Sequence, residues 1–135
     1  MYDSPESVPD VTEAELSVLK ALWRRGAATI RELTDELYPT GNTSHYATVQ
    51  KLLDRLKKKQ CVSREPQGRA HVFRATVERA ELISSRLQAT ANSLCEGSLT
   101  PLLTQLAGSA ELSSDDVAAL RDLVERFDGE TARDS

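Results

Sequence analysis

The residues from 43 to 59 carry the feature that most limits how this chain can fold. Their apolar residues are Val49, Leu52, Leu53 and Leu56. In an α-helix that spacing puts all four side chains on one face. Small, polar and basic residues occupy the remaining positions. The segment therefore predicts an amphipathic helix, beginning near Ser44, with its apolar face buried.

The polar face of this helix has the composition of a surface that contacts nucleic acid. Short side chains come early in the segment and cations come late. A helix in the major groove needs short side chains where its backbone approaches the bases, polar groups for base edges and cations for phosphates. The alternative is an ordinary solvated helix whose basic end suits the helix dipole.

Two further helices are predicted before this segment. Thr12–Glu15 and Thr29–Glu32 both match the capping box, in which a threonine and a glutamate three residues later satisfy backbone N–H groups. Gly26 is expected to end the first helix, and Pro39–Asn42 has the composition of a turn. A short helix, a turn and a longer amphipathic helix form a helix-turn-helix. Trp23 lies in line with the first apolar stripe and is expected to anchor the core.

After residue 60 the apolar pattern changes to alternation. Residues 61–65 and 71–75 alternate, and residues 66–70 have turn composition. This pattern predicts a β-hairpin. The side chains expected to point inward are Val62, Val72 or Phe73.

Three arginines lie along this hairpin: Arg64, Arg69 and Arg74. A basic hairpin directly after a recognition helix is typical of a wing, whose tip contacts phosphates or the minor groove. Arg69, at the tip, is the strongest candidate. The alternative is three solvated arginines on an edge hairpin.

The charge of the chain is divided unevenly. Residues 1–76 hold 12 Lys+Arg and 10 Asp+Glu, whereas residues 77–135 hold 5 and 11. Within residues 44–76 the count is 8 basic against 2 acidic, a net charge of +6. A basic segment of this kind is a better indication of nucleic-acid binding than the total of −4. The acidic charge of the rest of the chain can also be explained by solubility alone.

Three amphipathic helices are predicted from Val77 onward, ending near Gly97, Gly108 and Phe127. About fifty residues bury too little surface to be stable alone, and their apolar spacing suits packing against a second copy in a twofold dimer. The alternative is a small bundle packed on the first domain within one chain. The residues expected at the dimer contact are Ile83, Leu87, Leu94, Leu102, Leu106, Leu120, Val124 and Phe127.

The predicted fold class is mainly α with a small β-hairpin wing. Residues 1–10 are expected to be a disordered lead-in, and 11–76 a winged helix-turn-helix DNA-binding domain. Residues 77–127 are expected to form a helical dimerisation domain, and 128–135 a frayed tail.

Other function classes find little support in the sequence. No apolar run reaches the ~20 residues of a membrane span, and neither a signal peptide nor a disulfide framework is visible; a cytoplasmic protein without membrane insertion is the expectation. His45 and His71 are expected to lie apart, and Cys61 to be a small buried hydrophobe. Without a catalytic constellation, ligand spacing or a glycine-rich phosphate motif, we expect no enzyme, no metal site and no cofactor.

One stretch resembles a known family. Tyr46-Ala47-Thr48-Val49, followed by Leu53-Asp54-Arg55-Leu56-Lys57-Lys58-Lys59, is similar to the Tyr-x-Thr-Val…Leu-x-Arg-Leu-x-Lys-Lys run of the penicillinase and methicillin-resistance repressors (BlaI/MecI/CopY type). Residues 12–23 and 112–123 resemble the family's opening and closing helices. The resemblance implies a dimeric winged-helix transcriptional repressor on a pseudo-palindromic double-stranded DNA operator. It also implies a membrane sensor with a metalloprotease domain that acts on the repressor, which is released by cleavage of its dimerisation region.

The resemblance also assigns roles on the recognition helix. Its implied base-side positions are Ala47, Thr48, Gln50 and Lys51. The expected phosphate-side positions are Ser44, His45, Tyr46, Arg55, Lys58, Arg64 and Arg69. His45 fits a DNA contact and an exposed cap residue equally well. Asp54 lies on the same face, and either points out of the groove or pairs with Arg55 or Lys58.

The sequence departs from the family pattern in two places, and each departure limits which properties of the family are expected of this chain. Residues 102–107 lack the Asn-Phe pair cleaved in the best-known members, so cleavage at that bond is in doubt. The Cys-x-Cys motif of the copper-responsive members is absent. Two other hypotheses stay open: a winged-helix regulator with an effector site in the helical dimer bundle, and a protein-interaction module without a DNA role. The polar candidates for the effector site are Arg86, Gln88, Asn92 and Gln105.

Overall fold

The computed structural model describes residues 9–108 and 111–134. The chain divides into two compact units, residues 1–87 and 88–135. The elements are, in order, α1 (Glu13–Arg25), α2 (Ile30–Leu37), α3 (Thr43–Lys58), β1 (Val62–Gln67), β2 (Ala70–Ala75), α4 (Arg79–Leu94), α5 (Thr100–Gly108) and α6 (Ser114–Asp134). Mainly helical composition with one hairpin is the fold class that the sequence predicted, and the division between the two units falls within α4.

Both predicted capping boxes are present. The Glu15 N–H donates to Thr12 Oγ1 at 3.2 Å, and the Thr12 N–H donates to Glu15 Oε1 at 3.0 Å. Thr29 and Glu32 make the same exchange at 3.1 and 2.8 Å. Gly26 ends α1 at φ +83°, a left-handed conformation that favours glycine. These caps confirm the predicted starts of α1 and α2.

The turn before α3 depends on a glycine. A Cβ on Gly41 would lie 2.8 Å from the Tyr38 carbonyl oxygen, closer than a side chain can approach. Asn42 then caps α3 by accepting hydrogen bonds from the Ser44 and His45 N–H groups. The helix consequently begins at Thr43, one residue before the predicted start.

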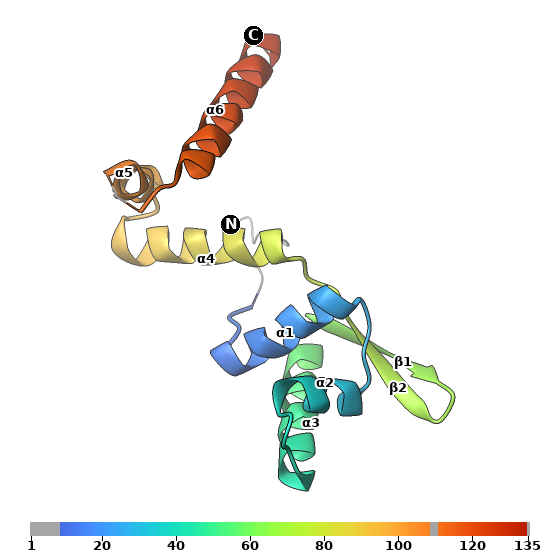
Figure 1. Ribbon diagram of the computed structural model, residues 1–135. Helices are drawn as coiled ribbons and strands as arrows, with labels where there is room; N and C mark the ends of the chain where they lie inside the picture. Colours follow the sequence, from blue (N-terminus) through green and yellow to red (C-terminus); the bar gives the residue numbers. More distant parts are fainter. Residues whose placement is uncertain (1–8, 109–110, 135) are drawn as a thin grey trace. The chain divides into compact units, whose positions relative to one another are not determined.

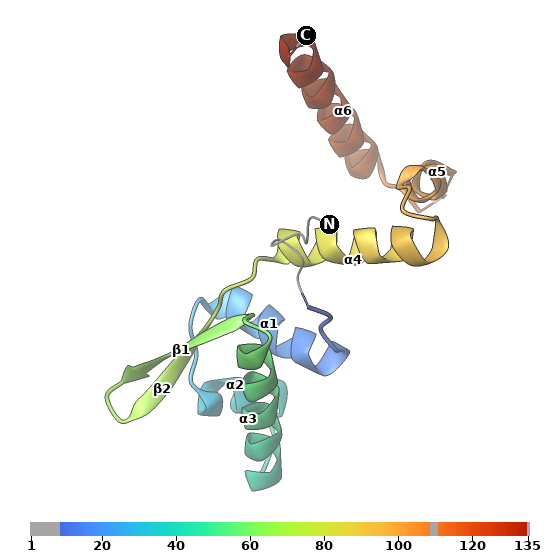
Figure 2. The same ribbon diagram turned by 180° about the vertical axis from the view of Figure 1, so that it is seen from behind.

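The core of the first unit lies where α1, α2 and α3 pack together (Figures 1 and 2). The predicted apolar stripe of α3 is buried throughout, and burial of each such side chain stabilises the fold by about 1.5–3 kcal/mol. From α1 the buried residues are Glu15, Val18, Leu19, Ala21 and Leu22. A capping glutamate is thus among the buried residues, which its charge and its place in the cap did not predict.

The hairpin is longer than predicted, because Pro66 and Ala70 belong to its strands. Val62 pairs with Ala75 at one end and Gln67 with Ala70 at the other. Gly68, at φ +64°, and Arg69 form the turn.

A third segment, which no local pattern predicted, joins this sheet. Ala28, between α1 and α2, exchanges backbone hydrogen bonds of 3.0 and 2.8 Å with Phe73. Val62 and Phe73 are buried, whereas Val72 lies on the opposite face and is half-buried.

The first half of α4 packs on the winged-helix elements. Leu82 is buried in the same core, and Trp23 Nε1 donates to the Val77 carbonyl at 2.9 Å. Arg86 donates to the Val11 carbonyl at 2.9 Å. Trp23 is half-buried and packs against the core, as predicted. These long-range contacts explain why the first unit extends to Leu87.

The second unit consists of the end of α4, α5 and α6. Ser98 Oγ accepts from the Thr100 N–H, and Ser113 and Asp116 form a capping pair at 3.1 Å. From residue 88 onward, Ala91 is the one buried residue among those whose burial is described. Residues 128–134, expected to be frayed, continue α6. Among the described residues no helix is long and apolar enough to span a bilayer.

Candidate nucleic-acid interface

The four predicted base-side residues lie together on the exposed face of α3. Ala47, Thr48, Gln50 and Lys51 are all exposed, while the apolar stripe beside them is buried. The hydroxyl of Thr48 donates to the Ser44 carbonyl at 3.0 Å, so its donor is used while its oxygen lone pairs can still accept. The face offers a methyl, a hydroxyl, an amide and an ammonium group, which are the groups that contact base edges in a major groove.

His45 is a structural residue at the start of this helix. Its Nδ1 accepts a hydrogen bond from the Asn42 N–H at 3.2 Å, and its ring stacks on Tyr38 with centroids 4.4 Å apart. The imidazole therefore fixes the turn between α2 and α3. Nδ1 is occupied, which leaves Nε2 as the nitrogen available to DNA.

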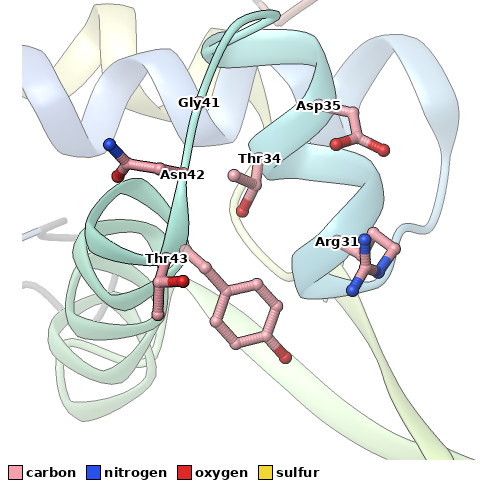
Figure 3. Close-up of a pocket in the computed structure, with 7 residues that line it drawn as sticks. Arg31, Thr34, Asp35, Gly41, Asn42 and Thr43 are labelled. Carbon is pink, nitrogen blue, oxygen red and sulfur yellow. The ribbon is translucent and has the colours of Figure 1, made fainter.

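A pocket of about 420 Å³ opens between α2 and the start of α3 (Figure 3). Arg31 and Asp35 come from α2, and Asn42 and Thr43 come from the turn and the first residue of α3. Tyr46, expected on the phosphate side, also lines the pocket and is 39% exposed. Sequence reasoning had placed no role on Arg31, Asn42 or Thr43, because nothing local shows that α2 folds against the start of α3.

The three consecutive lysines at the end of α3 do not share one environment. Lys57 and Lys58 are exposed. Lys59 is half-buried and donates to Glu15 Oε1 at 2.6 Å and to the Asp10 carbonyl at 2.7 Å. It therefore ties the end of α3 to the cap of α1.

Glu15 is the buried partner of this ion pair, with 1% of its side chain exposed. Burial raises the pKa of Glu15, but hydrogen bonds from Lys59 and from the Thr12 N–H outweigh burial and hold that pKa below its ordinary value. Glu15 is therefore ionised at neutral pH and joins α1 to α3.

The hairpin separates its arginines. Arg64 pairs with Phe73 across the strands and so shares its face, whereas Arg74 lies on the other face. Arg74 Nε lies 3.4 Å from Glu65 Oε1. Arg69 occupies the exposed turn. Arg64 and Arg69 are therefore the arginines of the hairpin without a carboxylate partner among the described residues.

Ion pairing sorts the cations of the first unit. Arg24 and Arg25 pair with Glu36 and Glu32, and Arg86 pairs with Glu13. Except for Lys20 on α1 and Arg79 on α4, every described cation of this unit without an ion pair lies on α2, α3 or the hairpin. Those on the three elements are Arg31, Lys51, Arg55, Lys57, Lys58, Arg64 and Arg69. The exposed positive charge is thus concentrated around the recognition-helix face.

The structure also defines the surroundings of two further side chains, Asp54 and Cys61. Asp54 is exposed and makes no ion pair with Arg55 or Lys58 in the described structure. Cys61 is buried, and burial raises the pKa of its thiol. Within residues 9–108 and 111–134 no group of three His, Cys, Asp or Glu side chains is placed to hold a metal ion.

Most predicted dimer-contact residues carry apolar side chains exposed in the single chain. Leu94 is 78% exposed, Phe127 68% and Val124 57%, while Leu102 and Leu120 are half-buried. The remaining exposed members of the set are Ile83, Leu87 and Leu106.

The four polar effector candidates are not gathered into one site by any described contact. Arg86 is engaged by Val11 and Glu13, and Gln88 Nε2 donates to Asn92 Oδ1 at 3.0 Å. Gln105 is exposed on α5.

Comparisons with known proteins agree with the predicted family. A family model described as penicillinase repressor matches residues 11–126. The chain is 25% identical over 120 residues to the penicillinase repressor of Bacillus licheniformis, covering 89% of this chain and 93% of that protein. It is 29% identical over 119 residues to an uncharacterized 16.5 kDa protein in the ptsI 3' region of Latilactobacillus sakei, covering 88% and 81%. The solution structure of the DNA-binding domain of the repressor BlaI is 30% identical, with a TM-score of 0.48, and the match covers 55% of this chain and 89% of that one.

Proposed function

We propose that this chain, which belongs to the penicillinase repressor family of DNA-binding transcriptional repressors, acts as a homodimer on a pseudo-palindromic operator. In this proposal each subunit places α3 in the major groove of one half-site. The helical second unit holds the two subunits together.

The observation that carries the proposal is the division of α3 into two faces. Val49, Leu52, Leu53 and Leu56 bind the helix to the core. The opposite face is exposed and surrounded by cations that have no carboxylate partner within residues 9–108 and 111–134. An isolated exposed cation gains little from a surface ion pair, but several around one helix attract the DNA backbone and release its counterions. A solvated helix with a basic end would not require the cations of α2 and the hairpin to gather around it.

The residues divide by role in the proposal. Ala47, Thr48, Gln50 and Lys51 contact base edges, which specify sequence. The residues that contact phosphates and fix the register are Ser44, His45, Tyr46, Arg55, Lys58, Arg64 and Arg69. Arg31 joins the phosphate-side group, because it lines the pocket beside Tyr46 and has no ion pair among the described residues.

The dimer in the proposal is formed by the exposed apolar side chains at the end of α4 and on α5 and α6. A unit with one buried residue among those described has little core of its own. Leu94, Val124 and Phe127 are too exposed to contribute to the single chain. A second copy supplies the apolar partner surface that each helix lacks.

The proposal includes release of the operator by proteolysis in the second unit, by a membrane sensor with a metalloprotease domain. Leu103 and Leu106 are exposed on α5, the region corresponding to the cleaved helix of the best-known members. With no Asn-Phe pair between Leu102 and Ala107, the cleaved bond differs from theirs. Mass spectrometry of the repressor recovered from induced cells tests this step. Full-length repressor throughout induction would refute it.

Binding of the full chain to promoter DNA beside its own gene tests the central proposal. The titration is repeated at several salt concentrations and fitted for stoichiometry, with a scrambled duplex of the same length as the control. Two chains on one pseudo-palindrome, with a steep salt dependence and about 10³-fold preference over scrambled DNA, is the expected result. Equal affinity for both duplexes would mean that the charge attracts DNA but α3 does not specify sequence.

A further inference from the structure

A second, smaller pocket lies between α1 and the first half of α4, and no residue of α3 or the hairpin lines it. Its volume is about 150 Å³. Four apolar side chains contribute to its walls: Leu16, Trp23, Leu82 and Ile83. Three cations complete the lining, and no carboxylate belongs to it: Lys20, Arg79 and Arg86.

Helical spacing explains why these side chains converge. Residues 16, 20 and 23 of α1 are separated by four and three positions, as are residues 79, 83 and 86 of α4. Side chains at these intervals lie on one face of a helix. Each helix therefore presents a mixed apolar and basic stripe to the same opening.

The three cations differ in how they are engaged. Arg86 is held by the Val11 carbonyl at 2.9 Å and by Glu13 at 3.7 Å. The guanidinium of Arg79 lies 4.9 Å from the centre of the Trp23 ring, within the range of a cation–π interaction. Neither Arg79 nor Lys20 makes an ion pair with a described residue. Two positive groups thus border an apolar pocket without a counter-charge from the described residues.

The remaining surface of the pocket is apolar in character. Trp23 Nε1 already donates to the Val77 carbonyl, so the ring has no further hydrogen-bonding group to offer. Leu82 is buried in the core of the first unit, whereas Ile83 is 52% exposed. The pocket therefore complements a molecule with one apolar part and one anionic end.

We propose that this pocket binds a small amphipathic carboxylate. The carboxylate accepts hydrogen bonds from Lys20 and Arg79, and the apolar part contacts Leu16, Leu82 and Ile83. The volume of about 150 Å³ is roughly half the lower end for drug-sized ligands, which limits the apolar part to a single ring or a short branched chain. The site lies outside the proposed DNA interface, so ligand binding at this pocket and DNA binding can be tested separately.

Benzoate is a suitable probe, since it joins one ring to one carboxylate. Trp23 is the only tryptophan of the chain and lines the pocket, so its fluorescence reports binding to the full-length protein. A ligand of this size supports a dissociation constant on the order of 1 mM. Benzamide, which is neutral and of nearly the same shape, and acetate, which lacks the ring, are each expected to bind at least about tenfold more weakly. Equal responses to benzoate and benzamide would overturn the assignment of an anionic ligand.

The variant Lys20→Gln/Arg79→Gln removes both uncommitted cations while preserving the apolar walls. It is expected to weaken benzoate binding by about tenfold or more, because each charge-assisted hydrogen bond to the carboxylate is lost. Arg121→Gln, an exposed cation on α6 without a described ion pair, is the matched control. Thermal unfolding of each variant establishes that it is folded. Unchanged benzoate binding by the double variant would refute the site.

A second copy of the chain is the competing occupant of this pocket. If it covers Ile83, the full-length protein shows no saturable benzoate response, and Ile83→Gln lowers the oligomeric state measured by sedimentation. That pair of results overturns the carboxylate proposal. Saturable benzoate binding by a protein that sediments as a dimer supports it, because the pocket is then open in the assembled molecule.

Discussion

Lys58 and Lys59 are neighbours in the sequence, yet replacing each by alanine is expected to change a different property of the protein. Lys58 is exposed and has no ion pair among the described residues. Lys59 is 28% exposed and bonded to Glu15, whose side chain is 1% exposed. The Lys58→Ala variant should lose affinity for DNA, and the Lys59→Ala variant should lose stability.

The magnitude for Lys58→Ala follows from counterion release. Each phosphate contact contributes about 0.9 to the slope of log K against log salt, so two subunits lose about 1.8. When salt rises fourfold, from about 50 to 200 mM, the factor by which DNA affinity falls should therefore be roughly ten times smaller for the variant than for the parent. Its free energy of unfolding should stay within about 0.5 kcal/mol of the parent value, as for other surface changes.

The magnitude for Lys59→Ala follows from the buried carboxylate that it leaves behind. Breaking a fully buried pair costs about 3–5 kcal/mol. Because Lys59 is partly exposed, we expect about 2–3 kcal/mol. For a unit of this size that corresponds to a fall in Tm of roughly 10 °C or more. The salt slope of DNA binding, measured at a temperature where the variant is folded, should not change.

Urea unfolding and salt-dependent DNA titration, run on both variants, separate the two roles. The double variant Glu15→Ala/Lys59→Ala provides a check, since removing both partners should cost less than the sum of the single changes. A Lys59→Ala variant that keeps its stability and loses salt dependence, as the Lys58→Ala variant does, would contradict this division of roles. Both lysines would then face the phosphates, and the Glu15 contact would not persist in solution.

Lys51→Ala should alter sequence preference by about 1–3 kcal/mol at one base position per half-site, measured by competition with single-base operator variants; unchanged preference would remove Lys51 from the base-side group. Phe127→Lys should shift the protein from dimer to monomer in sedimentation, because a cation replaces an exposed apolar contact. Gly41→Ala should cost about 1–3 kcal/mol in urea unfolding, because the new methyl group meets the Tyr38 carbonyl. The folded-state pKa of Glu15 is lowered, so its ionised form stabilises the fold above its ordinary pKa of 4.5, and that contribution disappears as pH falls through the lowered value. The stability gap between the parent and Glu15→Gln should therefore shrink below about pH 4.5; a gap that does not vary with pH would contradict it.

The local sequence pattern was sufficient to predict the helices, their caps and the presence of the hairpin. A capping box joins residues three apart, and a helical face joins residues three and four apart, so Thr12–Glu15 and Val49–Leu56 reveal their structure without knowledge of the rest of the chain. The start of the hairpin followed from the change in period after residue 60. The full length of its strands did not follow from the sequence, because Pro66 is a typical turn residue yet pairs with His71 in the sheet.

The roles of several charged residues required the tertiary structure. Lys59 is indistinguishable from Lys58 in the sequence, and only the approach of α1, 44 residues away, gives it a buried partner. Arg74 resembles Arg64 until the strand register places it beside Glu65 on the other face. Arg31 had no assigned role until α2 was seen beside the start of α3 (Figure 3).

The segments that form helices and strands, and the buried face of α3, can thus be read from the sequence, because those properties depend on residues within a few positions of one another. Tertiary structure alone decided that the first unit extends to Leu87, that Ala28 joins the sheet, and that α1 and α4 enclose a pocket with Arg79 over Trp23. These features join residues more than forty positions apart. No local spacing encodes such pairs, because they form only when the apolar faces of separate elements pack against one another.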